Sequence, residues 1–467
     1  MARASTKLRE IAAVATSPMW PHQAESFKFF KNKPRGFDNS APGTGKTRVQ
    51  IELYKARKKP RGRWLIVCPK TLMVPAWGED IEKYAPELTV AFAFAENREQ
   101  AFLAGTDVVV INTDGVKWLA EKPNQKLLKG FDHLTIDEYT SFKHSSSART
   151  KAMVVLRKLF QYRYGMSGTP TPNTVMELFT PSLIIDDGQR LGTSYTRLRN
   201  IIQVPTQIGP SANHLEWNDK PGAAQAINEM LGDITIRHPF DVMKHVPANY
   251  RDTKRFELSK RMRAIYIKME AECIVAFDEE SKVNAVHAAS LRSKLLQIAS
   301  GAVYDGSGNY QLVDTTRYEL VCDLIEEAGH SVVFFNWTHQ RDYLTKELDK
   351  RGITFAVIDG GVPQHQRDDI VRRYQAGEYR TILLHPRTGA HGLTLTRGDT
   401  TIFCSPIYEA DLMEQGIARI HRGAQDKVTR TIFVEAKSTV EAKVYARLNE
   451  KHAAMSDLLE MQAQKRA

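Results

Sequence analysis

The chain has 467 residues, of which 42% are hydrophobic and 25% are charged. At roughly 100–200 residues per domain, this length predicts about two to four domains that each bury a core, and the composition excludes a disordered chain. The longest apolar runs stop far short of the ~18 residues that a membrane span needs, so no membrane partner is expected. The formal net charge of +11 suits a polyanionic partner such as a nucleic acid.

Cysteine spacing argues against a zinc- or disulfide-stabilised protein, and the N-terminus argues against a secreted one. No Cys-x-x-Cys pair occurs, so the sequence predicts neither a zinc site nor a disulfide framework. The apolar run at residues 11–15 is too short for a secretory signal. Reduced thiols in a cytoplasmic protein are therefore expected at Cys68, Cys273, Cys322 and Cys404.

Residues 40–47 read Ser-Ala-Pro-Gly-Thr-Gly-Lys-Thr, which fits the phosphate-binding loop except at its first position. Such a loop turns backbone N–H groups toward phosphate oxygens, its lysine reaches the β- and γ-phosphates, and the next hydroxyl coordinates Mg²⁺. The alternative is a chance glycine-rich turn before a helix, which the Gly-Lys-Thr spacing disfavours. The candidate nucleotide-binding residues are Pro42, Gly43, Thr44, Gly45, Lys46 and Thr47, with Lys46 also catalytic and Thr47 also a metal ligand.

Short apolar strands alternate with amphipathic stretches in two separate parts of the chain. Alternation of strand and helix predicts doubly wound parallel sheets, and two series predict two lobes. The first series is 64–68, 89–94, 107–111, 133–136 and 162–166, and the second is 331–335, 354–358, 381–384, 400–404 and 429–434.

A carboxylate pair, Asp137 and Glu138, follows the fourth strand of the first series. Most Asp-Glu pairs are solvated surface charge, but a position after a buried strand downstream of a phosphate loop favours a catalytic role. There the first carboxylate holds the Mg²⁺ shell, and the second orients and deprotonates the attacking water.

Between the two series the pattern is mainly helical, as in residues 223–231 and 259–300, and several prolines interrupt it. We therefore expect three parts. Residues 1–180 form the first lobe, 181–312 a mainly helical insertion and linker, and 313–467 the second lobe with a C-terminal helix.

Near the C-terminus, residues 415–425 contain Gln415, Arg419 and Arg422. If this segment is a helix, the three side chains share one face, because they are four and three residues apart. Phosphoryl transfer needs positive charge for its transition state, and arginines from another lobe often supply it. The alternative is a solvated basic helix, and the two upstream motifs favour the arginine-finger role.

Taken in order, these motifs resemble a superfamily 2 DNA motor of the Swi/Snf ATPase type. Gln23 in Trp-Pro-His-Gln looks like the adenine-reading glutamine, and residues 65–71 through Trp77 are similar to the strand and backbone-contacting loop of that family. Ser167 and Thr169, in Ser-Gly-Thr-Pro-Thr-Pro-Asn, resemble the motif that couples hydrolysis to lobe movement.

The resemblance continues through the second lobe, at residues 331–338, 359–367, 388–395 and 415–425. It implies two RecA-like parallel-sheet lobes with the helical insertion between them. Thr140 departs from the His or Gln usual in the family after the carboxylate pair, and Thr394 stands where Asn is common. The chain has no recognisable histone-reading or zinc module, which favours a compact phage or prokaryotic form.

The resemblance also implies that each lobe contacts a nucleic-acid backbone. The alternative for each such residue is an ordinary polar position in a loop, without a nucleic-acid contact. The basic run at 55–63 is expected to be a solvated loop. The candidate contacts are Lys70, Thr71, Asn112 and Thr113 in the first lobe, and Asn336, Trp337, Thr388 and Gly389 in the second.

The sequence thus predicts an ATP- and Mg²⁺-dependent motor that couples hydrolysis to translocation on duplex or branched DNA with little sequence preference. A strand-separating helicase acting on DNA or RNA is the alternative within enzymes. A nucleotide-controlled DNA clamp with negligible turnover is the alternative outside them. The expected location is the cytoplasm, which is that of the prokaryotic host if a phage encodes the chain.

Overall fold

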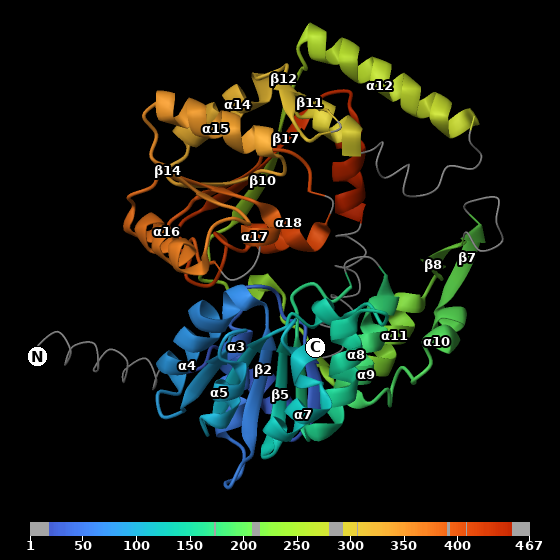
Figure 1. Ribbon diagram of the computed structural model, residues 1–467, viewed down its shortest axis with the longest axis vertical. Coiled ribbons are helices and arrows are strands. Elements are labelled where there is room, and N and C mark those ends of the chain that lie inside the picture. The colour runs from blue at the N-terminus through green and yellow to red at the C-terminus, as the bar shows by residue number, and fades with distance from the viewer. Residues whose placement is uncertain are drawn as a thin grey trace, which may run out of the picture. The chain divides into compact units, whose positions relative to one another are not determined.

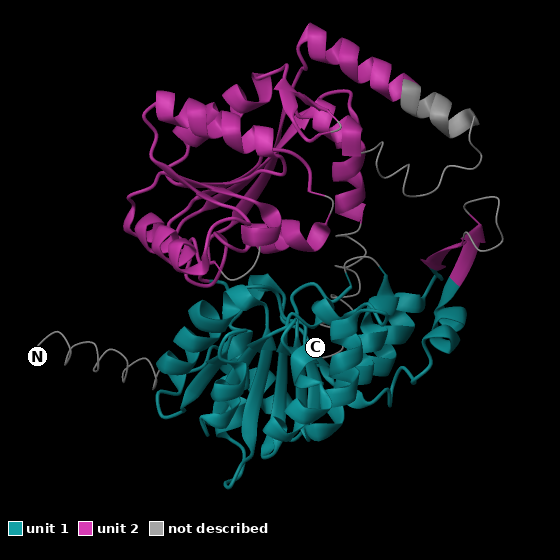
Figure 2. Ribbon diagram, in the orientation of Figure 1, with its two compact units in different colours: residues 1–203, 219–244, 454–467 teal, residues 204–218, 245–453 magenta. Residues whose placement is uncertain are grey.

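The computed structural model describes residues 18–171, 174–207, 215–279, 293–305, 307–389, 393–407 and 409–450. The chain divides into two compact units (Figure 2). Unit 1 comprises residues 1–203, 219–244 and 454–467, and unit 2 comprises 204–218 and 245–453.

Unit 1 is built on a seven-stranded sheet with the order β3-β4-β2-β5-β6-β1-β9. Its strands β2 and β5 are labelled in Figure 1. Every neighbouring pair in the sheet is parallel. The strands are β1 (Arg35–Asp38), β2 (Arg63–Cys68), β3 (Val90–Ala93), β4 (Val108–Asn112), β5 (Phe131–Asp137), β6 (Tyr162–Met166) and β9 (Thr235–Ile236).

Both faces of this sheet are covered, since its central strands β2, β4 and β6 are buried at almost every position. Along β2, Leu65 and Val67 join one hydrophobic cluster, whereas Trp64 and Ile66 join another. Side chains of a strand alternate between faces, so each face has its own core, as parallel sheets require. The helices of unit 1 are α2 (Pro21–Phe30), α3 (Lys46–Lys55), α4 (Glu79–Tyr84), α5 (Arg98–Leu103), α6 (Val116–Leu119), α7 (Lys122–Gln125), α8 (Ala148–Leu156), α9 (Phe179–Asp186), α10 (Tyr195–Ile202) and α11 (Ala223–Leu231).

Unit 2 repeats this plan with six parallel strands in the order β10-β17-β16-β13-β15-β14. Val333 packs into one cluster and its neighbours Val332 and Phe334 into another, so this sheet also has two cores. The strands are β10 (Asn249–Phe256), β13 (Ser331–Phe334), β14 (Phe355–Ile358), β15 (Thr381–Leu384), β16 (Thr400–Phe403) and β17 (Thr429–Ala436).

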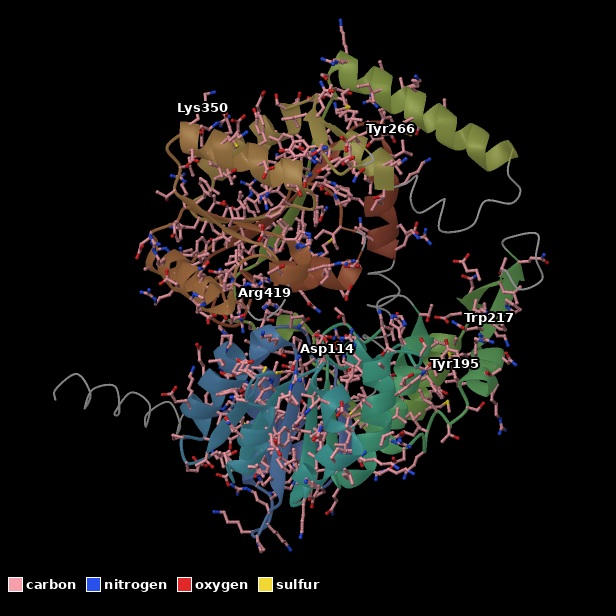
Figure 3. The ribbon with its side chains drawn as sticks, in the orientation of Figure 1. Asp114, Tyr195, Trp217, Tyr266, Lys350 and Arg419 are labelled. Carbon is pink, nitrogen blue, oxygen red and sulfur yellow. The ribbon has the colours of Figure 1, made fainter. Side chains whose placement is uncertain are left out.

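The helices of unit 2 are α12 (Lys260–Glu279), α14 (Thr316–Glu327), α15 (Thr338–Lys350), α16 (Gln364–Ala376), α17 (Pro386–Gly389) and α18 (Ala410–Ile417). The helix α12 is anchored by Tyr266 (Figure 3), whose buried hydroxyl accepts a hydrogen bond of 2.7 Å from Val440 N. Among the described residues, no helix is long and apolar enough to cross a membrane.

Two parallel sheets flanked by helices confirm the predicted fold class, and the ten predicted strands all form. The middle of the chain differs from the expected helical insertion at 181–312, because β9 completes the first sheet and β10 the edge of the second. Neither strand carries an apolar pattern: β9 has two residues, and β10 is an exposed edge strand rich in charge. The same region adds two hairpins, β7 (Gln203–Gln207) with β8 (Leu215–Asp219), and β11 (Ala302–Tyr304) with β12 (Tyr310–Leu312).

A buried ion pair joins the helices of unit 2 to its sheet. Arg317 and Glu441 are 1% and 0% exposed, and they meet at 2.6 Å. The same guanidinium donates to the carbonyl oxygens of Cys404 and Ala299. The Arg317 side chain therefore links the helix α14, the end of β16 and the segment that precedes β11.

We expect Glu441→Gln to lower the free energy of unfolding by about 3–5 kcal/mol, because it leaves the buried Arg317 guanidinium without its charge partner. Urea denaturation followed by circular dichroism measures this loss. The control is Glu378→Gln, which breaks the exposed pair of Glu378 with Arg373 and should leave the unfolding midpoint unchanged. Equal midpoints for the two variants would contradict the role of the buried pair.

Candidate nucleotide site and nucleic-acid interface

The candidate phosphate loop connects β1 to α3 at the carboxyl edge of the first sheet. Gly43 and Gly45 have φ values of 82° and 79°, a left-handed conformation that residues with a Cβ adopt at a cost. Gly45 is the N-cap of α3, so the first backbone N–H groups of the helix face the loop. A helix N-terminus behind a glycine-rich loop is suited to hold phosphate groups.

The ammonium group of Lys46 lies inside this loop. It donates hydrogen bonds to the carbonyl oxygens of Ser40 at 2.7 Å and Ala41 at 3.1 Å. Burial lowers the pKa of Lys46, and the negative charges of Asp38 and Asp137 oppose that shift. The loop therefore concentrates one positive charge where the sequence predicts the β- and γ-phosphates.

The segment at β9 supports the loop from the other side, and the motif analysis missed it. His238 O accepts a hydrogen bond from Ala41 N, and His238 N donates to Ser40 Oγ. Arg237 donates to Asn39 O at 2.6 Å. These contacts span nearly two hundred residues of sequence, and the two-residue strand that precedes Arg237 and His238 carries no periodic signal.

Gln23 on α2 also contacts the loop. Its Nε2 donates to Gly45 O at 3.2 Å, and its Oε1 accepts from Trp20 N at 2.9 Å. A Cβ at position 45 would lie 2.2 Å from the Gln23 amide nitrogen, so the glycine is needed for this contact as well as for its φ. The predicted adenine reader therefore packs directly on the phosphate loop.

Asp137 is the last residue of β5, and it is half-buried. Trp77 Nε1 donates to Asp137 Oδ2 at 2.9 Å. Burial, together with the charge of Glu138, raises the pKa of Asp137 to about 6, although the Trp77 hydrogen bond and the Lys46 charge oppose this shift. Such a perturbed carboxylate beside a lysine is typical of a functional site.

Glu138 turns away from β5 in a left-handed conformation, with φ 59° and ψ 62°. Its Oε1 accepts hydrogen bonds from Ser167 Oγ at 2.6 Å and Thr140 Oγ1 at 2.7 Å. A strained backbone at a catalytic position is common, because the surrounding contacts hold it. Thr140, which departs from the family pattern, therefore takes part in fixing this carboxylate.

The candidate coupling motif lies directly against the phosphate loop. Ser167 N donates to Asp38 O, and Thr169 N donates to Ser167 Oγ at 3.1 Å. A Cβ on Gly168 would lie 2.6 Å from the Pro42 side chain, so no larger residue fits there. The structure thus brings the loop, the carboxylate pair and the coupling motif together within unit 1.

The first-lobe nucleic-acid candidates gather at the same edge of the sheet. Lys70 and Thr71 follow β2, Asn112 ends β4, and these strands are parallel neighbours. Thr113 N donates to Cys68 O at 3.0 Å, which joins the two loops. Asp114, the next residue in the chain, is labelled in Figure 3.

In unit 2, Asn336 and Trp337 follow β13, and Thr388 and Gly389 end the short helix after β15. Asn336 Nδ2 donates to Ser405 Oγ at 2.9 Å and to Pro406 O at 2.8 Å, so its amide is engaged in holding the end of β16. Gly389 is buried against Leu384, which a Cβ would approach to 2.9 Å. A hollow at this edge is lined by Asn336, Trp337, His385, Arg387 and Glu409, among others.

The three C-terminal candidates do not share one helix. The helix α18 contains Gln415 but ends at Ile417, and Arg419 and Arg422 lie in the turns that follow. This corrects the conditional prediction of a common helical face. The physical reason is that the α-helix gives way to a tighter turn of the 3-10 type. Arg419 N donates to Gly416 O and Ile420 N donates to Ile417 O, so each hydrogen bond joins residues that are three apart.

The two arginines instead hold the segment after residue 392. Arg419 (Figure 3) donates to Leu393 O at 3.1 Å and to Gln415 O at 2.8 Å. Arg422 donates to Thr394 Oγ1 at 2.7 Å. Thr394, the second departure from the family pattern, therefore keeps a hydrogen bond at its position.

The basic run at residues 55–63 serves the fold of unit 1. Arg57 lies over the Tyr162 ring at 4.0 Å, and Arg63 donates to Thr106 O and Phe102 O. Lys55 pairs with Glu52 at 3.5 Å. These side chains bind protein groups, so most of the run is not a free charged loop.

The two parallel sheets, with a phosphate loop and a carboxylate pair at one carboxyl edge, define the class of the protein as a two-lobe helicase-type ATPase. Family models agree: the SNF2-related domain matches residues 37–300, and the helicase conserved C-terminal domain matches residues 316–424. The chain belongs to the SNF2-related family of superfamily 2, and it is an ATP-using enzyme.

Individual relatives are distant in sequence. The chain is 25% identical to protein p41 of Acyrthosiphon pisum secondary endosymbiont phage 1, over 91% of this chain and 94% of that protein. It is 22% identical to an uncharacterized ATP-dependent helicase, MG018, of Mycoplasma genitalium, over 92% of this chain but only 41% of the helicase. A solved Sulfolobus solfataricus SWI2/SNF2 ATPase core in complex with dsDNA aligns with 95% of this chain and 93% of its own, at 19% identity and a TM-score of 0.43.

The nucleotide site generates a paired prediction. Lys46→Ala should impair both ATP binding and turnover, because it removes the charge on the phosphates. Glu138→Gln should retain ATP binding but lower kcat roughly 10²- to 10⁴-fold, because the amide cannot accept the proton of the attacking water. Equilibrium binding of a fluorescent ATP analogue and steady-state phosphate release separate these effects. Near-normal turnover in the Glu138→Gln protein would refute its role as the base.

Proposed function

We propose that the protein is an ATP- and Mg²⁺-dependent motor that couples hydrolysis to translocation on duplex or branched DNA. The observation that carries this proposal is the bond from Ser167 in the coupling motif to Glu138, the candidate base. Because this bond joins the hydrolytic carboxylate to a separate loop, the state of one affects the position of the other. A DNA clamp with negligible turnover does not need a bond between its coupling motif and a hydrolytic carboxylate.

The site residues suit Mg²⁺ together with a nucleoside triphosphate. Thr47 and Asp137 offer the hard oxygen atoms that Mg²⁺ prefers, and the substrate phosphates complete such a shell. When bound, the ion neutralises charge on the phosphates. Lys46 holds the β- and γ-phosphates, Glu138 orients the water and accepts its proton, and Gln23 contacts the adenine.

DNA is the partner that the surface chemistry favours. The net charge of +11 attracts a polyanion, and the polar loops after β2 and β4 offer contacts to phosphates rather than to bases. The mycoplasma relative is named an ATP-dependent helicase, and a mouse relative a chromodomain-helicase-DNA-binding protein. A motor of this kind works where the DNA is, which is the cytoplasm in a prokaryotic host.

Arg419 and Arg422 supply the positive charge that the transition state needs. We expect Arg422→Ala to leave ATP affinity within a few-fold and to lower kcat by roughly 10³ or more, because an arginine finger acts on the transition state. Arg419→Ala is measured beside it, since either residue can be the main finger. If phosphate release stays normal in both variants, unit 2 does not complete the site.

A strand-separating helicase is the second candidate, and one feature of the structure favours it. The hairpin β7–β8 is a two-stranded ribbon that exposes Val204 and Leu215. A helicase needs a wedge between strands, and an exposed ribbon of this type is suited to that role. No catalytic residue distinguishes the two candidates, so their DNA substrates must.

We expect duplex DNA to stimulate the ATPase more than single strands do, and the protein to displace the third strand of a triplex more readily than it opens a plain fork. The physical reason is a grip on one strand of an intact duplex, which needs no separation of the strands. Fluorescent strand-displacement assays on the two substrates measure this, with the Glu138→Gln protein as the control without hydrolysis. Efficient fork opening without triplex displacement would favour the helicase.

A further inference from the structure

The indole of Trp77 lies against the end of β5, where hydrolysis is proposed to occur. Trp77 is fully buried, and its Nε1 donates to Asp137 Oδ2 at 2.9 Å. Because the indole holds one carboxylate oxygen, rotation of the Asp137 side chain would break this partly buried hydrogen bond. Trp77 therefore sets the orientation of the carboxylate that is the candidate Mg²⁺ ligand.

The backbone that carries Trp77 begins at the candidate DNA contacts. Lys70 and Thr71 form a 3-10 turn, η1 (Lys70–Leu72), and a π-helical turn, η2 (Met73–Gly78), follows without any linker. Single π-helical turns are rare and frequently occur at functional sites. The DNA-facing residues and the indole thus belong to one continuous helical run.

The inward side of this run is closely packed, although Val74 on its outer side is exposed. Met73 and Trp77 are both fully buried, and the Trp77 ring meets the Trp64 ring edge-on, with centroids 5.6 Å apart. A Cβ on Gly78 would lie 2.9 Å from the Phe92 ring. Because close-packed interiors transmit small shifts and Thr71 is continuous with the buried turn at Met73, we expect a movement at Thr71 to reach the indole.

We propose that Trp77 is a positioning residue that links occupancy of the DNA-contact segment at Lys70 and Thr71 to the orientation of Asp137. DNA that pulls on this segment reorients the indole, and the indole reorients the carboxylate. The proposal deepens the proposed function and rests on it. In this proposal, the DNA dependence of hydrolysis depends on the hydrogen bond from Trp77 Nε1 to Asp137 Oδ2.

The test compares Trp77→Phe with a matched control, Trp64→Phe. Trp64 is equally buried on the same side of the sheet, but its Nε1 donates to Thr135 Oγ1 at 3.0 Å instead of to the carboxylate. The first readout is the Mg²⁺ concentration for half-maximal binding of a fluorescent ADP analogue, without DNA or turnover. The second is the ratio of ATPase rates with and without duplex DNA.

Trp77→Phe should raise the half-maximal Mg²⁺ concentration about 10- to 100-fold, which is the usual effect of losing a partner that orients a metal ligand. It should also lower the stimulation ratio toward one, whereas Trp64→Phe should change neither readout by more than a few-fold. Unchanged values in Trp77→Phe overturn the proposal. Equal shifts in both variants overturn it too, because they indicate a general packing effect.

A measurement on the wild-type protein keeps the proposal testable if Trp77→Phe does not fold. In protein labelled with ¹⁵N-tryptophan, the Trp77 indole resonance should shift on addition of duplex DNA alone and again with Mg²⁺ and ADP. An unmoved Trp77 signal overturns the proposal. A wild-type ATPase that DNA does not stimulate overturns the proposed function itself, whereas a stimulated wild type with an equally stimulated Trp77→Phe overturns only the inference.

Discussion

Parallel pairing of β1, β2, β4, β5 and β6 is the constraint on which the first unit depends. Parallel strands all end at the same edge of a sheet, so every loop that follows a strand there meets the others. The candidate phosphate loop, the candidate DNA-contact loops, the carboxylate pair and the candidate coupling motif each lie at the end of one of these five strands. The strand order alone therefore makes neighbours of residues that are more than a hundred positions apart in the sequence.

Bringing these loops together at one edge strains the backbone of Glu138 and removes Lys46 from water. Glu138 sits in a left-handed conformation, which costs on the order of 1–3 kcal/mol, and Lys46 loses most of its contact with water. Two buried cores, one on each face of the sheet, supply the rigidity that holds these groups, and Ser167 and Asn39 form hydrogen bonds with the side chains of Glu138 and Tyr139. The site is therefore preorganised by the fold and not by its own loops.

Local patterns predicted the strands and motifs because each is written in a few consecutive residues. Apolar runs identify buried strands, and Gly-Lys-Thr identifies the loop. The support of the loop by Arg237 and His238 was not predictable, because it depends on a two-residue strand that pairs across the whole unit. The turns at Arg419 were missed for a related reason, since Arg419 there also forms hydrogen bonds with the distant Leu393 and Leu395.

The end of β5 joins two separate inputs at two adjacent residues. Asp137 receives the indole of Trp77 from the side of β2, and Glu138 receives the hydroxyl of Ser167 from the side of β6. Because β5 lies between these two strands in the sheet, each input comes from an immediate neighbour. Under the proposed function, one input orients the candidate metal ligand and the other orients the candidate base. We therefore propose that hydrolysis requires both neighbours to be in place, so that turnover depends on the candidate DNA-contact segment and the candidate coupling motif together.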